Sequence, residues 1–192
     1  MDKIEVLDKA IMERRSVYPH MFNDEKVPDT LIAQVLEMAK YAPSHRLTQP
    51  WRFTIITGAA RQRLSTYLGN YYTRNTPKDK YSEIKYKKTI AKPLQSSHII
   101  AICLKRDEEE SVPEWEEIAS LAMAVQNIWL SLSARGIGCY WSTPKSMVRE
   151  NKFLELEQSV RCLGIMYVGY PRITPSIPPR DDMDAKIEWI VR

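Results

Sequence analysis

The segment Ala42–Phe53 reads APSHRLTQPWRF and joins an amphipathic stretch to an apolar one. Pro43 and Pro50 restrict the backbone at two points, because proline fixes its own φ and disfavours helix in the residue before it. Between the prolines stand several hydrogen-bonding side chains: Ser44, His45, Arg46, Thr48 and Gln49. Stiff polar loops on a scaffold commonly carry binding residues. The segment therefore predicts a helix–loop–strand junction that forms part of a binding site.

Apolar periodicity on either side of this junction predicts both helices and strands. Helices are expected over residues 2–14, 29–41, 59–69, 114–135 and 146–153, with an inserted helical excursion over 70–92. Strands are expected over residues 51–57, 98–104, 163–170 and 186–191, and residues 172–182 should run extended. This order favours an α+β fold, with one sheet covered by helices. We expect one domain over residues 1–192, without an internal repeat.

The longest expected helix has recognisable signals at both ends. Ser111 stands three residues before Glu114, which is the spacing of a capping box. Gly136 follows the helix at the position where a glycine commonly ends one. Apolar residues cover most of the circumference, which is typical of a helix buried centrally or at a subunit interface.

Composition excludes several classes of protein. The net charge of +4 is mild, and no run of about 18 apolar residues predicts a membrane span. The N-terminus lacks the apolar region of a signal peptide. Cys103, Cys139 and Cys162 are widely spaced in apolar segments, which favours reduced core residues of a cytoplasmic protein over a metal site or disulfide. Residues 71–92 are basic and rich in tyrosine, so they form either a solvated helical flap or a nucleic-acid surface.

Acid–base constellations are not evident in the sequence. It shows no Ser/His/Asp order, paired-carboxylate motif or HExxH, and Gly136-x-Gly138 lacks the third glycine of a dinucleotide fingerprint. A cofactor enzyme needs none of them, because the cofactor carries the chemistry and the protein binds and orients it.

Arg14-Arg15-Ser16, at the end of the first expected helix, has two interpretations. Two cations at a helix C-terminus are favoured by the helix dipole, and the serine would then belong to a turn. Alternatively, guanidinium forks and a hydroxyl form a clamp for a phosphate group. His45 is similarly either a loop residue bonded to backbone or a ligand contact.

Five segments in this order resemble the FMN-dependent nitroreductases. They are RRS at 14–16, APS…QPWRF at 42–53, RGIG at 135–138, WST at 141–143 and LGIMYVGYP at 163–171. His45 and Leu47 replace the small polar pair common in this family, and the loop is closer to a compact subgroup with the pattern A-P-x-H-[KR]-x-x-Q-P-W. Residues 70–92 match poorly and are where substrate selection would vary.

The resemblance implies a nitroreductase-like fold with a mostly antiparallel central sheet, and a homodimer with FMN at its interface. The C-terminal segment would extend to the partner subunit, and His45 would reach the flavin of the neighbouring subunit. The implied FMN-binding residues are Arg14, Arg15, Ser16, His45, Trp141, Ser142, Thr143 and Arg180. Arg180 is either a phosphate contact or a solvated charge.

The implied reaction is a ping-pong transfer of a hydride from NADH or NADPH to an electron-poor small molecule such as a nitroaromatic or quinone. The flavin N5 would carry the chemistry, so no catalytic side chain and no metal is expected. A flavin-binding module without turnover and a basic nucleic-acid-binding domain remain the alternatives. The sequence leaves open the natural acceptor and the choice between NADH and NADPH.

Overall fold

The computed structural model describes residues 2–150 and 152–191. Its sheet has four strands in the order β1-β2-β4-β3, and every neighbouring pair is antiparallel. The strands are β1 (Trp51–Ile56), β2 (His98–Lys105), β3 (Gly138–Ser142) and β4 (Val160–Gly169). The α+β class and the antiparallel sheet are therefore confirmed, and the apolar run at 98–104 is an inner strand as predicted.

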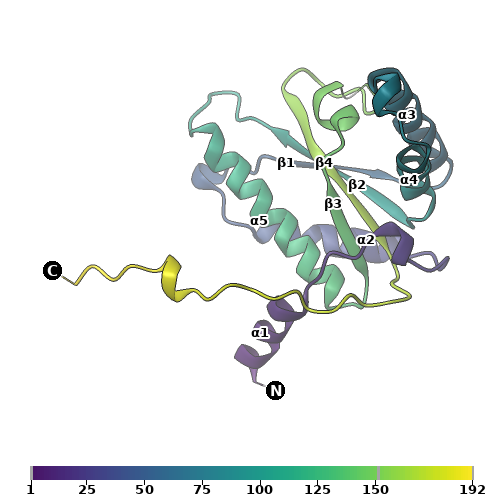
Figure 1. The fold of residues 1–192 in the computed structure, drawn as a ribbon. Helices are drawn as coiled ribbons and strands as arrows, with labels where there is room; N and C mark the ends of the chain where they lie inside the picture. The colour runs from purple at the N-terminus through teal and green to yellow at the C-terminus, as the bar shows by residue number, and fades with distance from the viewer. Residues whose placement is uncertain (1, 151, 192) are drawn as a thin grey trace.

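Helices cover both faces of this sheet (Figure 1). Alternate residues of β2 point to opposite sides, as the pleat of a strand requires. Ile100, Ile102 and Leu104 pack under α2 (Asp29–Leu36) and α5 (Glu114–Ser133). Ile99 and Ala101 pack on the other side, under α3 (Ala59–Asn75). A strand buried on both faces explains why β2 reads as a continuous apolar run.

Several boundaries differ from the prediction. The helix expected over 59–69 continues to Asn75 in α3, and α4 (Glu83–Leu94) packs antiparallel to it, so residues 70–92 belong to a helical hairpin. The helix expected over 29–41 tightens to 3-10 geometry over Glu37–Tyr41. The helix expected over 146–153 is a single π-type turn over Ser146–Glu150.

One predicted helix end was wrong and one strand was not predicted. Ser111 does not cap α5, because its hydroxyl donates to the Asp107 carboxylate and Pro113 occupies the cap position instead. Gly138–Ser142, which was not among the expected strands, is an edge strand. Gly136 does end the preceding helix as predicted, with φ at +71°.

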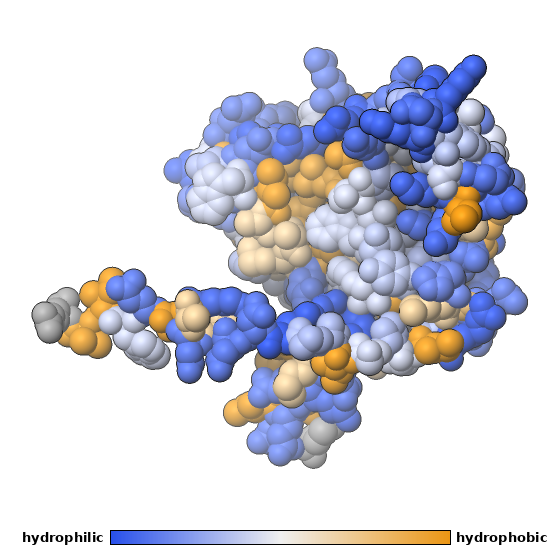
Figure 2. Space-filling model, in the orientation of Figure 1, coloured by the Kyte–Doolittle hydropathy of each residue, from blue (hydrophilic) through white to orange (hydrophobic). Residues whose placement is uncertain are grey.

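The C-terminal segment leaves the body of the molecule. Residues 172–182 run extended, as predicted, but the strand expected over 186–191 is wrong: a short 3-10 turn over Asp184–Lys186 is followed by irregular chain to residue 191. α1 (Lys3–Glu13) projects beside this tail (Figure 1). No residue of α1 is buried, and Ile4 and Leu7 are 69% and 57% exposed. Figure 2 shows apolar patches on the tail, on α1 and on the surface above the tail.

Candidate functional site

The first part of the candidate site lies where the chain leaves α1. A capping box between Asp2 and Glu5 starts this helix, which ends at Glu13. The following residues run beside the free edge of β3: Ser16 forms a bridge with Cys139, and the Val17 N–H donates to the Cys139 carbonyl at 3.0 Å. The sheet edge thus fixes the position of the Arg14-Arg15-Ser16 segment.

The two arginines of this segment play different structural roles. The Arg14 guanidinium lies 4.7 Å from the centre of the Trp129 ring, a cation–π contact that orients it. The Arg15 guanidinium turns back and donates to the carbonyls of Met12 and Arg14, two acceptors left free at the end of the helix. Trp129 also donates to the Arg15 carbonyl at 3.1 Å. Arg15 therefore serves as a helix cap, and Arg14 is the arginine available to a ligand.

Arg14, Arg15 and Arg180 line one cavity of about 660 Å³, although Arg180 is far away in sequence. The tail brings Arg180 there through Pro178 and Pro179, which line the same cavity. No Asp or Glu of the described residues lines it. Three guanidinium groups without a carboxylate make the cavity suited to an anion, since arginine matches phosphate geometry.

Trp141, Ser142 and Thr143 lie at the far end of β3, and a close approach of β4 fixes their backbone. Gly164 in β4 has φ at +147°, and a Cβ built there would lie 2.3 Å from Trp141 Nε1 and 2.7 Å from the Ser142 carbonyl oxygen. Trp141 Nε1 is buried and has no hydrogen-bond partner among the described residues. The Arg14-Arg15-Ser16 segment therefore runs beside the same edge strand that contains this tryptophan.

Sequence reasoning missed two residues on this edge. The Tyr18 ring centre is 4.5 Å from that of Tyr140 on β3, and the Lys92 ammonium lies 5.7 Å from the centre of the same ring. Tyr18 follows Ser16 at the alternating spacing of an extended chain, which is a signal that could have indicated it. Lys92 belongs to the basic stretch 71–92, for which the sequence indicates either a solvated helical flap or a nucleic-acid surface, so only the fold reveals its proximity to β3.

Within one chain, His45 lies apart from the predicted arginines of the site. Its Nδ1 lies 2.5 Å from Glu116 Oε2, near the start of α5, whereas Arg14 packs on Trp129 thirteen residues later. At 1.5 Å per residue, that spacing corresponds to about 20 Å along the helix. The structure thus separates His45 from the arginine cavity.

The loop around His45 is held in an uncommon backbone conformation. Arg46, Leu47 and Gln49 have φ values of +51°, +57° and +44°. The Ser44 hydroxyl oxygen accepts from the Gln49 N–H at 2.9 Å and lies 3.2 Å from the Thr48 hydroxyl. Such strain persists where the surroundings hold it, and it is common at ligand sites.

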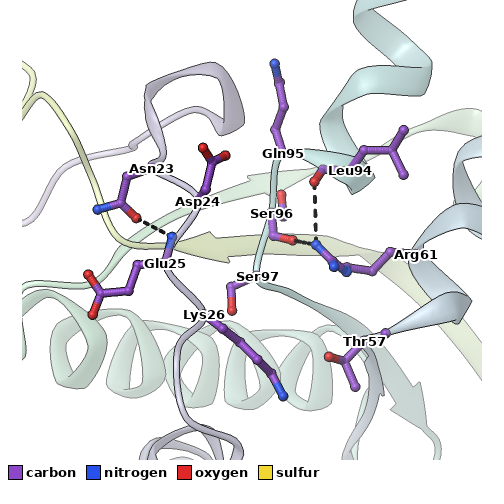
Figure 3. A pocket seen from close by; sticks show the side chains of 11 residues that line it. Asn23, Asp24, Glu25, Lys26, Thr57, Arg61, Leu94, Gln95, Ser96 and Ser97 are labelled. Carbon is purple, nitrogen blue, oxygen red and sulfur yellow. Dashed lines mark hydrogen bonds between the residues drawn. The ribbon is translucent and has the colours of Figure 1, made fainter.

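A separate cavity of about 390 Å³ contains none of the predicted residues (Figure 3). There the Arg61 guanidinium donates to the carbonyls of Leu94 and Ser96, at the end of α4. Arg61 therefore ties α3 to the end of α4, and residues 23–26 line the other side of this cavity.

Possible metal ligands and thiols were located among the described residues. Within residues 2–150 and 152–191, no three His, Cys, Asp or Glu side chains cluster as metal ligands would. All three cysteines are free and buried, and burial raises the pKa of the Cys139 thiol well above its usual value. No helix over the same ranges is long and apolar enough to cross a membrane.

Known proteins resemble this chain in sequence and in fold. The family model described as "Nitroreductase family" matches residues 11–170. A Bacillus subtilis protein named as an NAD(P)H nitroreductase, YfhC, is 27% identical over 91% of this chain and 89% of its own. The FMN-dependent nitroreductase NfnB from Mycobacterium smegmatis, solved in complex with NADPH, superposes with a TM-score of 0.79 at 19% identity, over 98% of this chain and 100% of that chain. A 5,6-dimethylbenzimidazole synthase from Rhodospirillum rubrum is 24% identical over 90% of this chain and 85% of its own.

Proposed function

Because the chain belongs to the nitroreductase family, we propose that it is an FMN-dependent oxidoreductase that uses NADH or NADPH to reduce an electron-poor acceptor, such as a nitroaromatic or a quinone. The observation that carries the proposal is the cavity shared by Arg14, Arg15 and Arg180, between the end of α1, α5 and the C-terminal tail. The similarity to a synthase means that the family alone does not fix the acceptor.

The residues present fit a phosphate-bearing cofactor. A phosphate monoester carries about two negative charges at neutral pH and accepts several hydrogen bonds. Arg14 and Arg180 supply the cations, and the Ser16 hydroxyl stands at the start of the edge strand. At the other end of β3, the backbone of Trp141–Thr143 would border a planar ring. The proposed cofactor therefore has a phosphate at one end and a planar ring at the other.

FMN, when bound, supplies the hydride chemistry at its N5 atom. The chain's own contribution is then to bind and orient: Arg14 and Arg180 hold the phosphate, and the backbone of Trp141–Thr143 forms one wall for the ring. No side chain of this chain is assigned as an acid or base. The buried thiols fit a reducing compartment, and we place the protein in the cytoplasm.

A homodimer would complete the site. The exposed apolar residues of α1 and Trp115 and Met123 on α5 have no cover in a single chain. The separation of His45 from Arg14 has a simple explanation if His45 acts in the site of the partner subunit, with the two sites at the interface. The projecting tail would lie on that partner, as the family resemblance implies.

The first test is cofactor binding with a matched ligand pair. Arg14→Gln should weaken FMN binding by about 10- to 100-fold, because a hydrogen bond to a charged group contributes about 1.5–3 kcal/mol. Riboflavin, which lacks the phosphate, should bind the variant and the parent equally. Arg63→Gln, an exposed arginine of α3, is the control and should leave both affinities unchanged. A parent protein that takes up no FMN would refute the proposal.

Turnover is tested by anaerobic titration of the FMN-loaded protein with NADH and with NADPH. Bleaching of the flavin absorbance near about 450 nm, followed by reoxidation with a quinone or nitroaromatic, supports an oxidoreductase. Stable FMN binding without bleaching by either nucleotide would instead establish the flavin-binding module.

Subunit mixing tests the placement of His45. If each site takes Arg14 from one subunit and His45 from the other, a hybrid of Arg14→Gln and His45→Ala subunits contains one intact site and one doubly altered site. The hybrid should then bind FMN at one site per dimer with the parent affinity. If both residues served the same site within one subunit, no hybrid site would be intact and FMN affinity would not recover.

A further inference from the structure

A third cavity, of about 610 Å³, lies between α4 and the short 3-10 turn at Pro19–Met21. Its volume falls within the roughly 300–1,000 Å³ typical of small-molecule sites. Tyr18, Pro19 and His20 line one side, and Lys87, Lys88 and Lys92 line the other. It is distinct from the arginine cavity, since the two share no lining residue.

The lysine side chains that line this cavity give it a positive charge. No carboxylate lies within 4.0 Å of the ammonium groups of Lys88 and Lys92 among the described residues, and Lys87 is 3.7 Å from Glu83 Oε1 on the exposed side of α4. Among the described residues no Asp or Glu lines the cavity, and His20 is the remaining titratable group apart from Tyr18. Lys88 and Lys92, which have no counter-charge there, favour an anion together with Lys87, and lysine binds an anion as a point charge.

The opposite side is aromatic. The rings of Tyr18 and His20 are 6.0 Å apart at an interplanar angle of 18°, and Tyr18 is 42% exposed. Planar rings of this kind stack on a heterocyclic base, as they do in nucleic-acid sites. The cavity thus combines a stacking surface with a cluster of lysines.

The cavity also opens beside the proposed cofactor strand. Tyr18 packs on Tyr140 of β3, and Lys92 lies over the same ring. A nucleotide bound there would lie against β3, the strand that we assign to the flavin. Of the proposed substrates, only the nicotinamide nucleotides carry both a purine base and phosphate groups.

We infer that this cavity binds the phosphorylated adenosine of NADPH, and that Lys87 and Lys88 select NADPH over NADH by contacting the 2′-phosphate. This inference rests on the proposed function and deepens it. The 2′-phosphate is the one group that distinguishes the two nucleotides, and it carries about −1.5 to −2 charge at pH 7. The basic character of residues 70–92 would then have a role in substrate choice.

The direct test uses a probe that needs neither flavin nor turnover. Calorimetry of the full chain with 2′,5′-ADP and with 5′-AMP should show at least about tenfold tighter binding of 2′,5′-ADP, as expected for one charge-assisted contact. The variant Lys87→Gln/Lys88→Gln should lose this preference. Lys78→Gln/Lys80→Gln, which removes two lysines outside the cavity, should retain it. Equal binding of the two nucleotides by the parent, or an unchanged preference in the first variant, overturns the inference.

Two further binding measurements distinguish other ligands that a basic aromatic cavity could hold. Displacement of 2′,5′-ADP by inorganic phosphate at equal concentration would indicate a phosphate site without recognition of the nucleoside, and would overturn the inference. Salt-sensitive binding of single-stranded DNA, lost in Lys87→Gln/Lys88→Gln, would overturn it in favour of a nucleic-acid surface.

Kinetics separate this inference from the proposed function. In FMN-loaded protein, Lys87→Gln/Lys88→Gln should lower kcat/KM for NADPH by about tenfold and leave that for NADH unchanged. If both nucleotides reduce the parent and the variant alike, the proposed function stands and the inference fails. If neither nucleotide reduces the parent, the proposed function fails, and the inference fails with it even where 2′,5′-ADP binds.

Discussion

Replacing Gly164 with alanine should disrupt the contact between β4 and Trp141. The added Cβ would lie 2.3 Å from Trp141 Nε1, 2.9 Å from Trp141 Cδ1 and 2.7 Å from the Ser142 carbonyl oxygen. These distances are too short for non-bonded atoms, and one of the contacts is with backbone that cannot rotate away. Either the tryptophan or the end of β3 must move.

The cost has two contributions. A non-glycine residue in a sparsely populated backbone region costs about 1–3 kcal/mol, and φ at Gly164 is +147°. Overpacking a close-packed site adds about 1–3 kcal/mol. The sum, about 2–6 kcal/mol, is a large share of the roughly 5–15 kcal/mol that stabilises a typical domain.

Gly136→Ala is the matched control. Its φ is also positive, at +71°, but a Cβ there would meet no atom within 4 Å. This variant should therefore lose only the backbone contribution, about 1–2 kcal/mol. The difference between the two variants isolates the clash with Trp141.

Urea denaturation followed by far-UV circular dichroism measures both free energies of unfolding. We expect Gly164→Ala to be less stable than Gly136→Ala by about 1–3 kcal/mol and to bind FMN more weakly. Equal stability of the two variants, within about 0.5 kcal/mol, would show that the sheet absorbs the methyl group without moving Trp141.

Three other predictions concern buried polar groups and thiols. Glu117→Gln should lower the free energy of unfolding by about 2–3 kcal/mol. This is less than the roughly 3–5 kcal/mol usual for a broken buried ion pair, because the partner Arg106 is 25% exposed. The control Glu114→Gln breaks a surface ion pair and should lower it by less than about 1 kcal/mol, with both values measured by urea denaturation. Burial lowers the pKa of His98, whose ring is hydrogen-bonded to Asp29, below the unfolded value of 6.5. The unfolded chain therefore binds more protons at this residue than the folded chain, and the free energy of unfolding falls as the pH drops below about 6.5. His98→Gln should flatten that slope between about pH 7.5 and 5.5, and an unchanged slope would assign it to other groups. A thiol reagent should label none of the three cysteines in the folded protein and all of them in urea; rapid labelling of the folded chain would contradict their burial.

Much of the fold was predictable because its local signals agree with its packing. The run at 98–104 is apolar throughout, and such a run fits only an inner strand covered on both sides. Gly136 ended its helix where the sequence indicated. The strand at Gly138–Ser142 was missed because its five residues include a glycine, a serine and two large aromatics, without alternation.

The predictions at the two chain ends had different outcomes. The helix expected over residues 2–14 is present as α1 and the strand expected over 186–191 is not, although the apolar residues of both segments are exposed in one chain. α1 forms because its capping box satisfies the first turn locally. The expected C-terminal strand has no neighbouring edge with which to pair among the described residues, so it does not form.

The candidate site was predictable in composition more than in arrangement. Sequence motifs indicated Arg14 and Arg180 as site residues, and the course of the tail brings Arg180 to the cavity that Arg14 also lines. No local signal reveals that Lys92 lies over Tyr140, because that contact depends on how the α3–α4 hairpin packs against the sheet. Charge and aromatic content alone could not separate a solvated flap from a nucleotide cavity.

The uncovered apolar face of α1 has a thermodynamic consequence. This helix has no buried residue of its own and leads directly into Arg14, so whatever orders α1 also orders the arginine that we propose binds the phosphate. If a second copy of the chain supplies that cover, self-association and cofactor affinity are linked, and each must strengthen the other by the same factor. Dilution would then release the cofactor, and added FMN would draw dissociated chains together.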